Sequence, residues 1–171
     1  TIEGGDIQAY LQDLTARVND HDKIEILTDA TITGFSGYKG NFTTNLATGA
    51  DAGEHTINHG VIIVATGAKQ YPPSEYLYPE SDRVVTQVEL SDRLEEKGAK
   101  DLDSVVMIQC VGSRNEENVN CSRLCCQSAV KNALALKKLN PDTAIYILYR
   151  DMRTYGLLED YYKEAREKGI I

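Results

Sequence analysis

The residues of this chain best suited to chemistry are its four cysteines, which are Cys110, Cys121 and the adjacent pair Cys125 and Cys126. Four thiolates with no histidine nearby can hold either an iron–sulfur cluster or a structural zinc ion. Structural zinc sites usually combine two closely spaced pairs of cysteines, and this segment lacks the first pair. The spacing therefore favours an iron–sulfur cluster over zinc. A third interpretation keeps Cys126 as a buried apolar residue and the other three thiols as free groups.

A strand and the helix after it must position these cysteines. The apolar run 104–109 predicts a strand that ends at Cys110, and a helical pattern over about 122–139 begins beside the other three cysteines. A helix N-terminus offers unpaired N–H groups and partial positive charge, which lower the pKa of a thiol and stabilise the thiolate. Arg114 and Arg123 add positive charge. The sequence thus predicts that one strand–helix turn gathers the four thiols in one pocket.

The rest of the second half alternates helices and strands, with helices expected at about 87–96 and 158–168 and a second strand at 144–149. This alternation is typical of βαβ units with a parallel sheet. The turn after the first strand contains Gly112 alone, whereas a dinucleotide normally requires a G-x-G-x-x-G turn. Asp151 follows the second strand, where such folds place the residue that binds ribose. Gly112 and Asp151 are therefore the candidate nucleotide contacts of this lobe.

The first part of the chain has a different pattern. Apolar residues at helical spacing predict a helix over 7–19, capped by Asp6. Short β-like runs predict a small antiparallel meander; they lie at 24–27, 30–35, 42–46 and 55–58, with turns at 36–40 and 48–53. Val61–Ala65 is continuously apolar and predicts a buried strand. The stretch 69–85 holds three of the four prolines and predicts a connector between two lobes.

Taken together, these segments resemble a known family. Residues 61–68 resemble the Ala-Thr-Gly strand that closes over FAD in flavoproteins of the thioredoxin-reductase type. Residues 106–114, 121–126 and 146–156 resemble the A subunit of heterodisulfide reductase and its close relatives. The likeness runs from about Ile24 to the last residue, and the cysteine segment is its most specific part.

The resemblance implies an α/β chain with a partial, thioredoxin-reductase-like flavoprotein fold, made of a small antiparallel meander and a Rossmann-like parallel βαβ lobe. Residues 1–68 would be part of an FAD-binding domain, residues 69–85 the connector, and residues 86–171 the lobe that carries the cysteines. Cys110, Cys121, Cys125 and Cys126 would bind a [4Fe-4S] cluster, and Ala65, Thr66 and Gly67 would lie on the FAD side.

The resemblance also implies a function. The chain would belong to an oxidoreductase that passes electrons between FAD, [4Fe-4S] clusters and other subunits of a heterodisulfide reductase-type complex. The glycine turn for FAD and the Cys-x2-Cys segments of that family are not found in these residues. We therefore expect an internal fragment that is inactive alone and that binds FAD and NAD weakly or not at all.

Composition limits the other possibilities. Of the 171 residues, 18 are basic and 26 acidic, and no cluster of Lys and Arg is found, so we expect no nucleic-acid partner. The longest apolar run, Val61–Ala65, is far too short to span a membrane. Without a signal peptide we expect a cytoplasmic protein with reduced thiols. His21, His55 and His59 are expected to be solvated surface groups.

Two alternatives stay open beside the electron-transfer interpretation. The first is a non-catalytic docking module stapled by zinc, which would be colourless where an iron–sulfur cluster is brown. The second is a degenerate NAD-binding domain, against which the single glycine in the turn at Gly112 counts.

Overall fold

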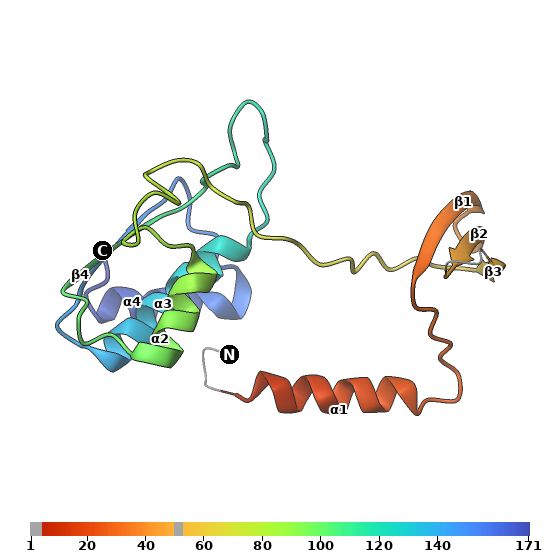
Figure 1. The fold of residues 1–171 in the computed structure, drawn as a ribbon, viewed down its shortest axis with the longest axis horizontal. Helices are drawn as coiled ribbons and strands as arrows, with labels where there is room; N and C mark the ends of the chain where they lie inside the picture. The colour runs from red at the N-terminus through yellow and green to blue at the C-terminus, as the bar shows by residue number, and fades with distance from the viewer. Residues whose placement is uncertain (1–4, 50–52) are drawn as a thin grey trace. The chain divides into compact units, whose positions relative to one another are not determined.

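The computed structural model describes residues 5–49 and 53–171. It divides the chain into two compact units, one ending at Lys69 and the other spanning Gln70–Ile171 (Figure 1). The first unit contains α1 (Ile7–Asn19), β1 (Ala30–Tyr38), β2 (Asn41–Thr48) and β3 (Gly53–His59). The second contains α2 (Gln87–Lys97), β4 (Ser104–Ile108), α3 (Leu124–Leu139), β5 (Ala144–Leu148), a 3-10 turn (Gly156–Leu158) and α4 (Glu159–Glu167).

The first unit contains helix α1 and a three-stranded antiparallel sheet in the order β1-β2-β3, and this sheet confirms the predicted meander. Helix α1 begins where expected, because the side chain of Asp6 accepts a hydrogen bond from the Ala9 amide at 2.9 Å. The β-like run Ile24–Leu27 forms no strand, so that prediction is wrong. Part of the predicted turn at 48–53 lies outside the described residues.

The turn predicted at 36–40 is also wrong in part. Ser36, Gly37 and Tyr38 belong to β1 and pair with β2, which leaves only Lys39 and Gly40 for the turn. Gly37 has a φ of +103°, and a Cβ built there would lie 2.2 Å from the Asn41 carbonyl oxygen. This glycine therefore permits a close approach between two strands, although its sequence context suggested a turn.

Val61–Ala65 is not a buried strand, in contrast to the prediction from its apolar run. The segment is extended without ladder hydrogen bonds, and the side chains of Val61 and Ile63 are 76% and 86% exposed. A strand covered on both faces requires neighbours, and none of the described residues pairs with this segment in a sheet. An apolar, β-branched run indicates that a segment can form a strand, but the segment is buried only where neighbouring strands cover it.

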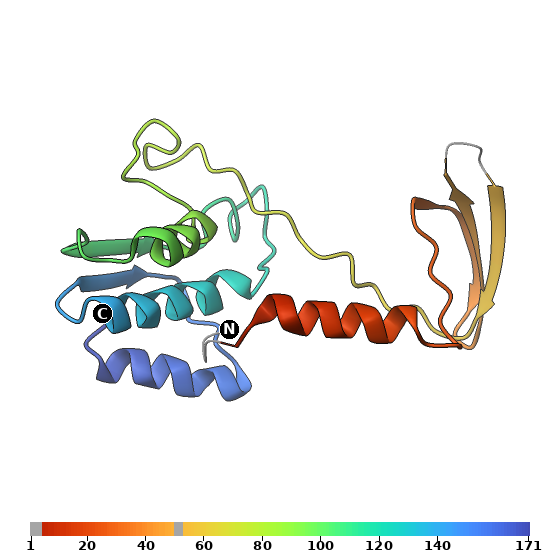
Figure 2. The same ribbon diagram turned by 60° about the horizontal axis from the view of Figure 1, so that its bottom comes forward.

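The second unit contains the predicted parallel βαβ arrangement: β4 and β5 pair in parallel and α3 connects them. Ile171 continues this sheet, since its amide donates to the Ile145 carbonyl at 3.0 Å and its carbonyl accepts from the Ile147 amide at 2.7 Å. Figure 2 shows α2, α3 and α4 side by side, with α3 in the middle. The α/β fold with an antiparallel meander and a parallel lobe is thus confirmed.

The core of the second unit lies between this sheet and the helices. Met107, Ile145 and Ile147 point into it from alternate sheet positions and meet the buried face of α3. The opposite face of the sheet is exposed and carries Val106, Ile108, Tyr146 and Leu148. Within residues 5–49 and 53–171, none of the helices combines the length and apolar character that crossing a bilayer requires.

One polar side chain joins α2 to α3 inside this core. Asn132 is 1% exposed, and its amide nitrogen donates to the backbone carbonyl and the side-chain oxygen of Gln87 at 2.8 and 2.7 Å. Its own oxygen accepts from the Ser91 hydroxyl at 2.8 Å. Because all of its hydrogen-bonding groups are engaged, Asn132 fixes how the helix that carries two cysteines sits against α2.

Candidate cysteine site

The four cysteines lie on or beside the turn that leads from β4 into α3, as the sequence predicts. Three residues of this turn, Cys110, Arg114 and Arg123, have positive φ angles of 64°, 57° and 64°. A residue with a side chain pays about 1–2 kcal/mol for this left-handed conformation. Such residues persist where surrounding contacts hold them, and they gather at functional sites.

The cysteines differ in their surroundings. Cys126 is buried in the first turn of α3, and its thiol donates to the Asp151 carbonyl over 3.7 Å. Cys110, Cys121 and Cys125 are half-buried. The sulfur of Cys121 accepts from the Arg123 amide at 3.4 Å, a contact within its own turn.

The adjacent thiols of Cys125 and Cys126 shift each other's pKa in opposite directions. The neighbouring Cys126 thiol lowers the pKa of Cys125 to about 5, and Ser122 and backbone N–H groups at the start of α3 also lower it, whereas burial opposes them. Cys125 and burial raise the pKa of Cys126, as does the charge of Cys110. The start of α3 therefore favours a thiolate at Cys125, and Cys110 lies within electrostatic range of the pair.

Cys110 thus lies within electrostatic range of the adjacent Cys125 and Cys126, while the Cys121 sulfur accepts from an amide of its own turn. Among the described residues, no three His, Cys, Asp or Glu side chains are grouped as metal ligands. One pocket holding all four thiols stays a prediction.

A salt bridge fastens the turn to the end of β5. Nη2 of Arg114 lies 2.6 Å from Oδ2 of Asp151, and Arg153 approaches the same oxygen at 3.6 Å. Arg150 donates to the Arg114 carbonyl. The Arg114 guanidinium holds the pKa of Asp151 below its usual range. Asp151, the predicted ribose contact, is therefore an ion-pair partner of Arg114 here, and its contact with a nucleotide stays a prediction.

The surroundings of the Arg114 guanidinium indicate whether the site can bind an anionic group. Its side chain is 20% exposed, and its Nη1 is buried with no acceptor among the described residues. A buried donor without an acceptor costs about 1–3 kcal/mol, and more on a charged group. A four-thiolate iron–sulfur cluster is anionic and has sulfur acceptors, so both the donor set and this orphaned N–H fit it.

Gly112 is covered by an aromatic ring that no sequence pattern predicts. Its φ is +66°, and a Cβ built there would lie 2.4 Å from Cε1 of Tyr71. Gly112 therefore has a packing role in this turn, and its role in nucleotide contact stays a prediction. Tyr71 lies in the proline-rich stretch, where no periodic pattern marks a residue as a contact.

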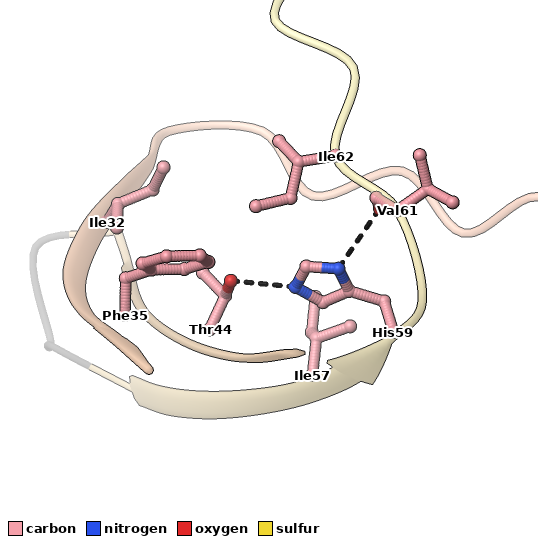
Figure 3. Close-up of a pocket in the computed structure, with 7 residues that line it drawn as sticks. All are labelled: Ile32, Phe35, Thr44, Ile57, His59, Val61 and Ile62. Carbon is pink, nitrogen blue, oxygen red and sulfur yellow. Dashed lines mark hydrogen bonds between the residues drawn. The ribbon is translucent and has the colours of Figure 1, made fainter. Parts of the chain in front are cut away.

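The first unit carries a separate hollow on its meander (Figure 3). The cavity is about 420 Å³ in volume and is lined by Ile32, Phe35, Thr44, Ile57, His59, Val61 and Ile62. His59 contacts Thr44 Oγ1 through Nε2 at 2.8 Å and the Val61 carbonyl through Nδ1 at 3.1 Å. His59 is half-buried and both of its ring nitrogens have partners, so the prediction that it is a solvated group is wrong. His21 and His55 are exposed, as predicted.

The predicted FAD-side residues follow the lining residues Val61 and Ile62 in sequence and belong to the same unit. Ala65, Thr66 and Gly67 are exposed, and Gly67 has a φ of +69°. Their contact with FAD stays a prediction.

Comparison with known proteins gives consistent relatives. No family model matches the chain. It is 33% identical to the A subunit of the ferredoxin:CoB-CoM heterodisulfide reductase of Methanosarcina acetivorans, over 67% of this chain and 20% of the relative. It is 37% identical to the A subunit of the H(2)/formate:CoB-CoM heterodisulfide,ferredoxin reductase of Methanococcus maripaludis, with the same coverage of both chains.

A third relative is named for its metal content. The iron-sulfur A subunit of the CoB--CoM heterodisulfide reductase of Methanocaldococcus jannaschii is 37% identical over 64% of this chain and 19% of the relative. The chain therefore spans about a fifth of the length of the curated relatives that it matches.

Proposed function

This chain belongs to the family of heterodisulfide reductase A subunits, and from that premise we propose that it is the part of an electron-transferring oxidoreductase that holds a [4Fe-4S] cluster. Cys110, Cys121, Cys125 and Cys126 are the proposed ligands. When bound, the cluster accepts and donates one electron at a time.

The observation that carries this proposal is that the thiols lie near Arg114, whose Nη1 has no acceptor among the described residues. The charge of Cys110 acts on the adjacent cysteine pair, and the start of α3 favours a thiolate at Cys125. Arg114 adds a positive charge and an unused N–H at the same turn. For Cys121 to join, the turn between Gly112 and Cys121 must adjust, and its exposed residues leave room for that.

We further propose that the first unit forms one side of an FAD site in the whole protein. Val61–Ala65 has the composition of a strand and exposed side chains, so added strand neighbours would bury it. Ala65, Thr66 and Gly67 would then end that strand beside FAD. The electron partners are other subunits of a heterodisulfide reductase-type complex, and four free thiols suit the reducing cytoplasm.

Iron and acid-labile sulfide analysis after anaerobic reconstitution tests the cluster. Wild type should bind iron and sulfide and absorb visible light, and each of the four single Cys→Ser variants should lose much of both. Ser113→Ala changes the same turn without removing a thiol and should keep both. Stoichiometric zinc with neither iron nor sulfide in wild type would refute the proposal and leave the zinc-stapled docking module.

A further inference from the structure

Arg114 makes more polar contacts than any other charged residue of the turn between β4 and α3. Its guanidinium pairs with Asp151 at 2.6 Å, and its carbonyl accepts from Arg150. The pKa of Arg114 is raised, first by its hydrogen bond to Asp151 and also by the neighbouring Cys110. One side chain thus links the end of β5 to the first cysteine.

The backbone around Arg114 is held in an unfavourable conformation. Arg114 and Cys110 both have positive φ, and neither is a glycine. Holding both in this region costs free energy, which contacts of the two residues must offset. The Asp151 salt bridge is such a contact, and it comes from a residue 37 positions away in the sequence.

We infer that Arg114 is a positioning residue of the cysteine site: Asp151, whose carbonyl also accepts from the Cys126 thiol, orients the Arg114 guanidinium beside the cysteines and leaves the Nη1 hydrogens for the anionic group that the cysteines bind. This inference rests on the proposed function.

The inference predicts an effect on redox equilibrium. Reduction adds negative charge to the cluster, so a nearby guanidinium favours the reduced form and raises the midpoint potential. Replacing Arg114 with an uncharged residue should shift the one-electron reduction equilibrium about tenfold toward the oxidised form, which corresponds to 59 mV. Lys keeps the charge, although it lacks the planar guanidinium fork that can bind Asp151 and still offer a second N–H group.

The experiment compares Arg114→Gln, Arg114→Lys and Arg93→Gln in the anaerobically purified protein. Arg93 is a matched control because it is 30% exposed and pairs with Asp101 at 2.5 Å on α2, away from the cysteines. Iron content is measured first, and the midpoint potential is then followed by electron paramagnetic resonance. We expect a lower potential in Arg114→Gln, with Arg114→Lys closer to wild type and Arg93→Gln unchanged.

The outcomes separate this inference from the proposed function. Wild type without iron would refute the proposed function itself. Wild type with iron and an unchanged potential in Arg114→Gln would overturn the role of Arg114 alone. If Arg114→Gln loses its iron, retention of iron in Arg114→Lys at a near-normal potential supports the inference. Loss of iron in both variants would make Arg114 purely structural and overturn it.

Discussion

Replacing Asn132 with Asp tests the buried joint between α2 and α3 with almost no change in side-chain volume. The native amide nitrogen donates to two Gln87 oxygens, and a carboxylate cannot donate to either. The bond from Ser91 can persist, since that oxygen is an acceptor in both residues. The substitution therefore removes two hydrogen bonds and places a charge where the native side chain is 1% exposed.

The magnitude follows from these contacts. Two lost hydrogen bonds cost about 1 kcal/mol each, and an unpaired buried carboxylate brings the total to about 3–5 kcal/mol at pH 8. Protonation restores a neutral group, so the loss should shrink to about 2 kcal/mol near pH 4. Burial should raise the pKa of the carboxyl introduced at position 132 in the folded state above its unfolded value of about 3.9. The free energy of unfolding of the variant therefore falls as the pH rises between these two pKa values.

Urea unfolding followed by circular dichroism at several pH values measures this difference. Asn120→Asp adds the same charge at an exposed position and serves as the control. The control should stay within about 0.5 kcal/mol of wild type throughout. Equal stability of the two variants at pH 8, or a loss in Asn132→Asp that does not vary with pH, would refute the role assigned to Asn132.

Three further outcomes can be checked on the same chain. Thr86→Ala should lower the free energy of unfolding in urea by about 1 kcal/mol, because Thr86 and Glu89 cap the start of α2 reciprocally. Glu89→Gln keeps the hydrogen-bond acceptor of this cap and should lower it by less. Gly112→Ala should lower the free energy of unfolding by about 2–4 kcal/mol, because of the positive φ and the contact with the Tyr71 ring. In a Tyr71→Ala background the same substitution should lower it by only about 1–2 kcal/mol. Equal losses in the two backgrounds would contradict the packing role of Gly112. Calorimetric titration with FAD or NAD should give dissociation constants well above the micromolar range, which corresponds to about 8 kcal/mol, and tighter binding of either would refute that expectation.

Helices and strands with strong local signals were predictable from the sequence. The apolar spacing and the cap at Asp6 placed α1, and the alternation of runs placed β4, α3 and β5 to within two residues at each end. Val61–Ala65 carried an equally strong signal and failed. The composition of this segment can be read from the sequence, whereas its burial requires a neighbouring strand that the local sequence does not specify.

The candidate site was predictable only where it depends on neighbours in sequence. The strand end at Cys110 and the helix start beside Cys125 follow from local patterns. The pairing of Arg114 with Asp151 and the contact of Tyr71 with Gly112 join segments 37 and 41 positions apart, which no spacing rule encodes. Asn132 was missed because a single polar residue on a helix predicts a solvated position, unless its partners on another helix are known.

The backbone of Val61–Ala65 is exposed and joins no sheet ladder among the described residues, which makes this segment the expected site of proteolytic cleavage. Proteases bind extended segments whose amides are free of a sheet ladder, and elastase-type enzymes cut after small apolar residues such as Val64 and Ala65. A brief digestion should therefore cut in this segment before it attacks the helices, and release Gln70–Ile171 with only a few extra residues at its start. Mild trimming thus offers a practical route to a minimal cysteine-bearing unit for spectroscopy.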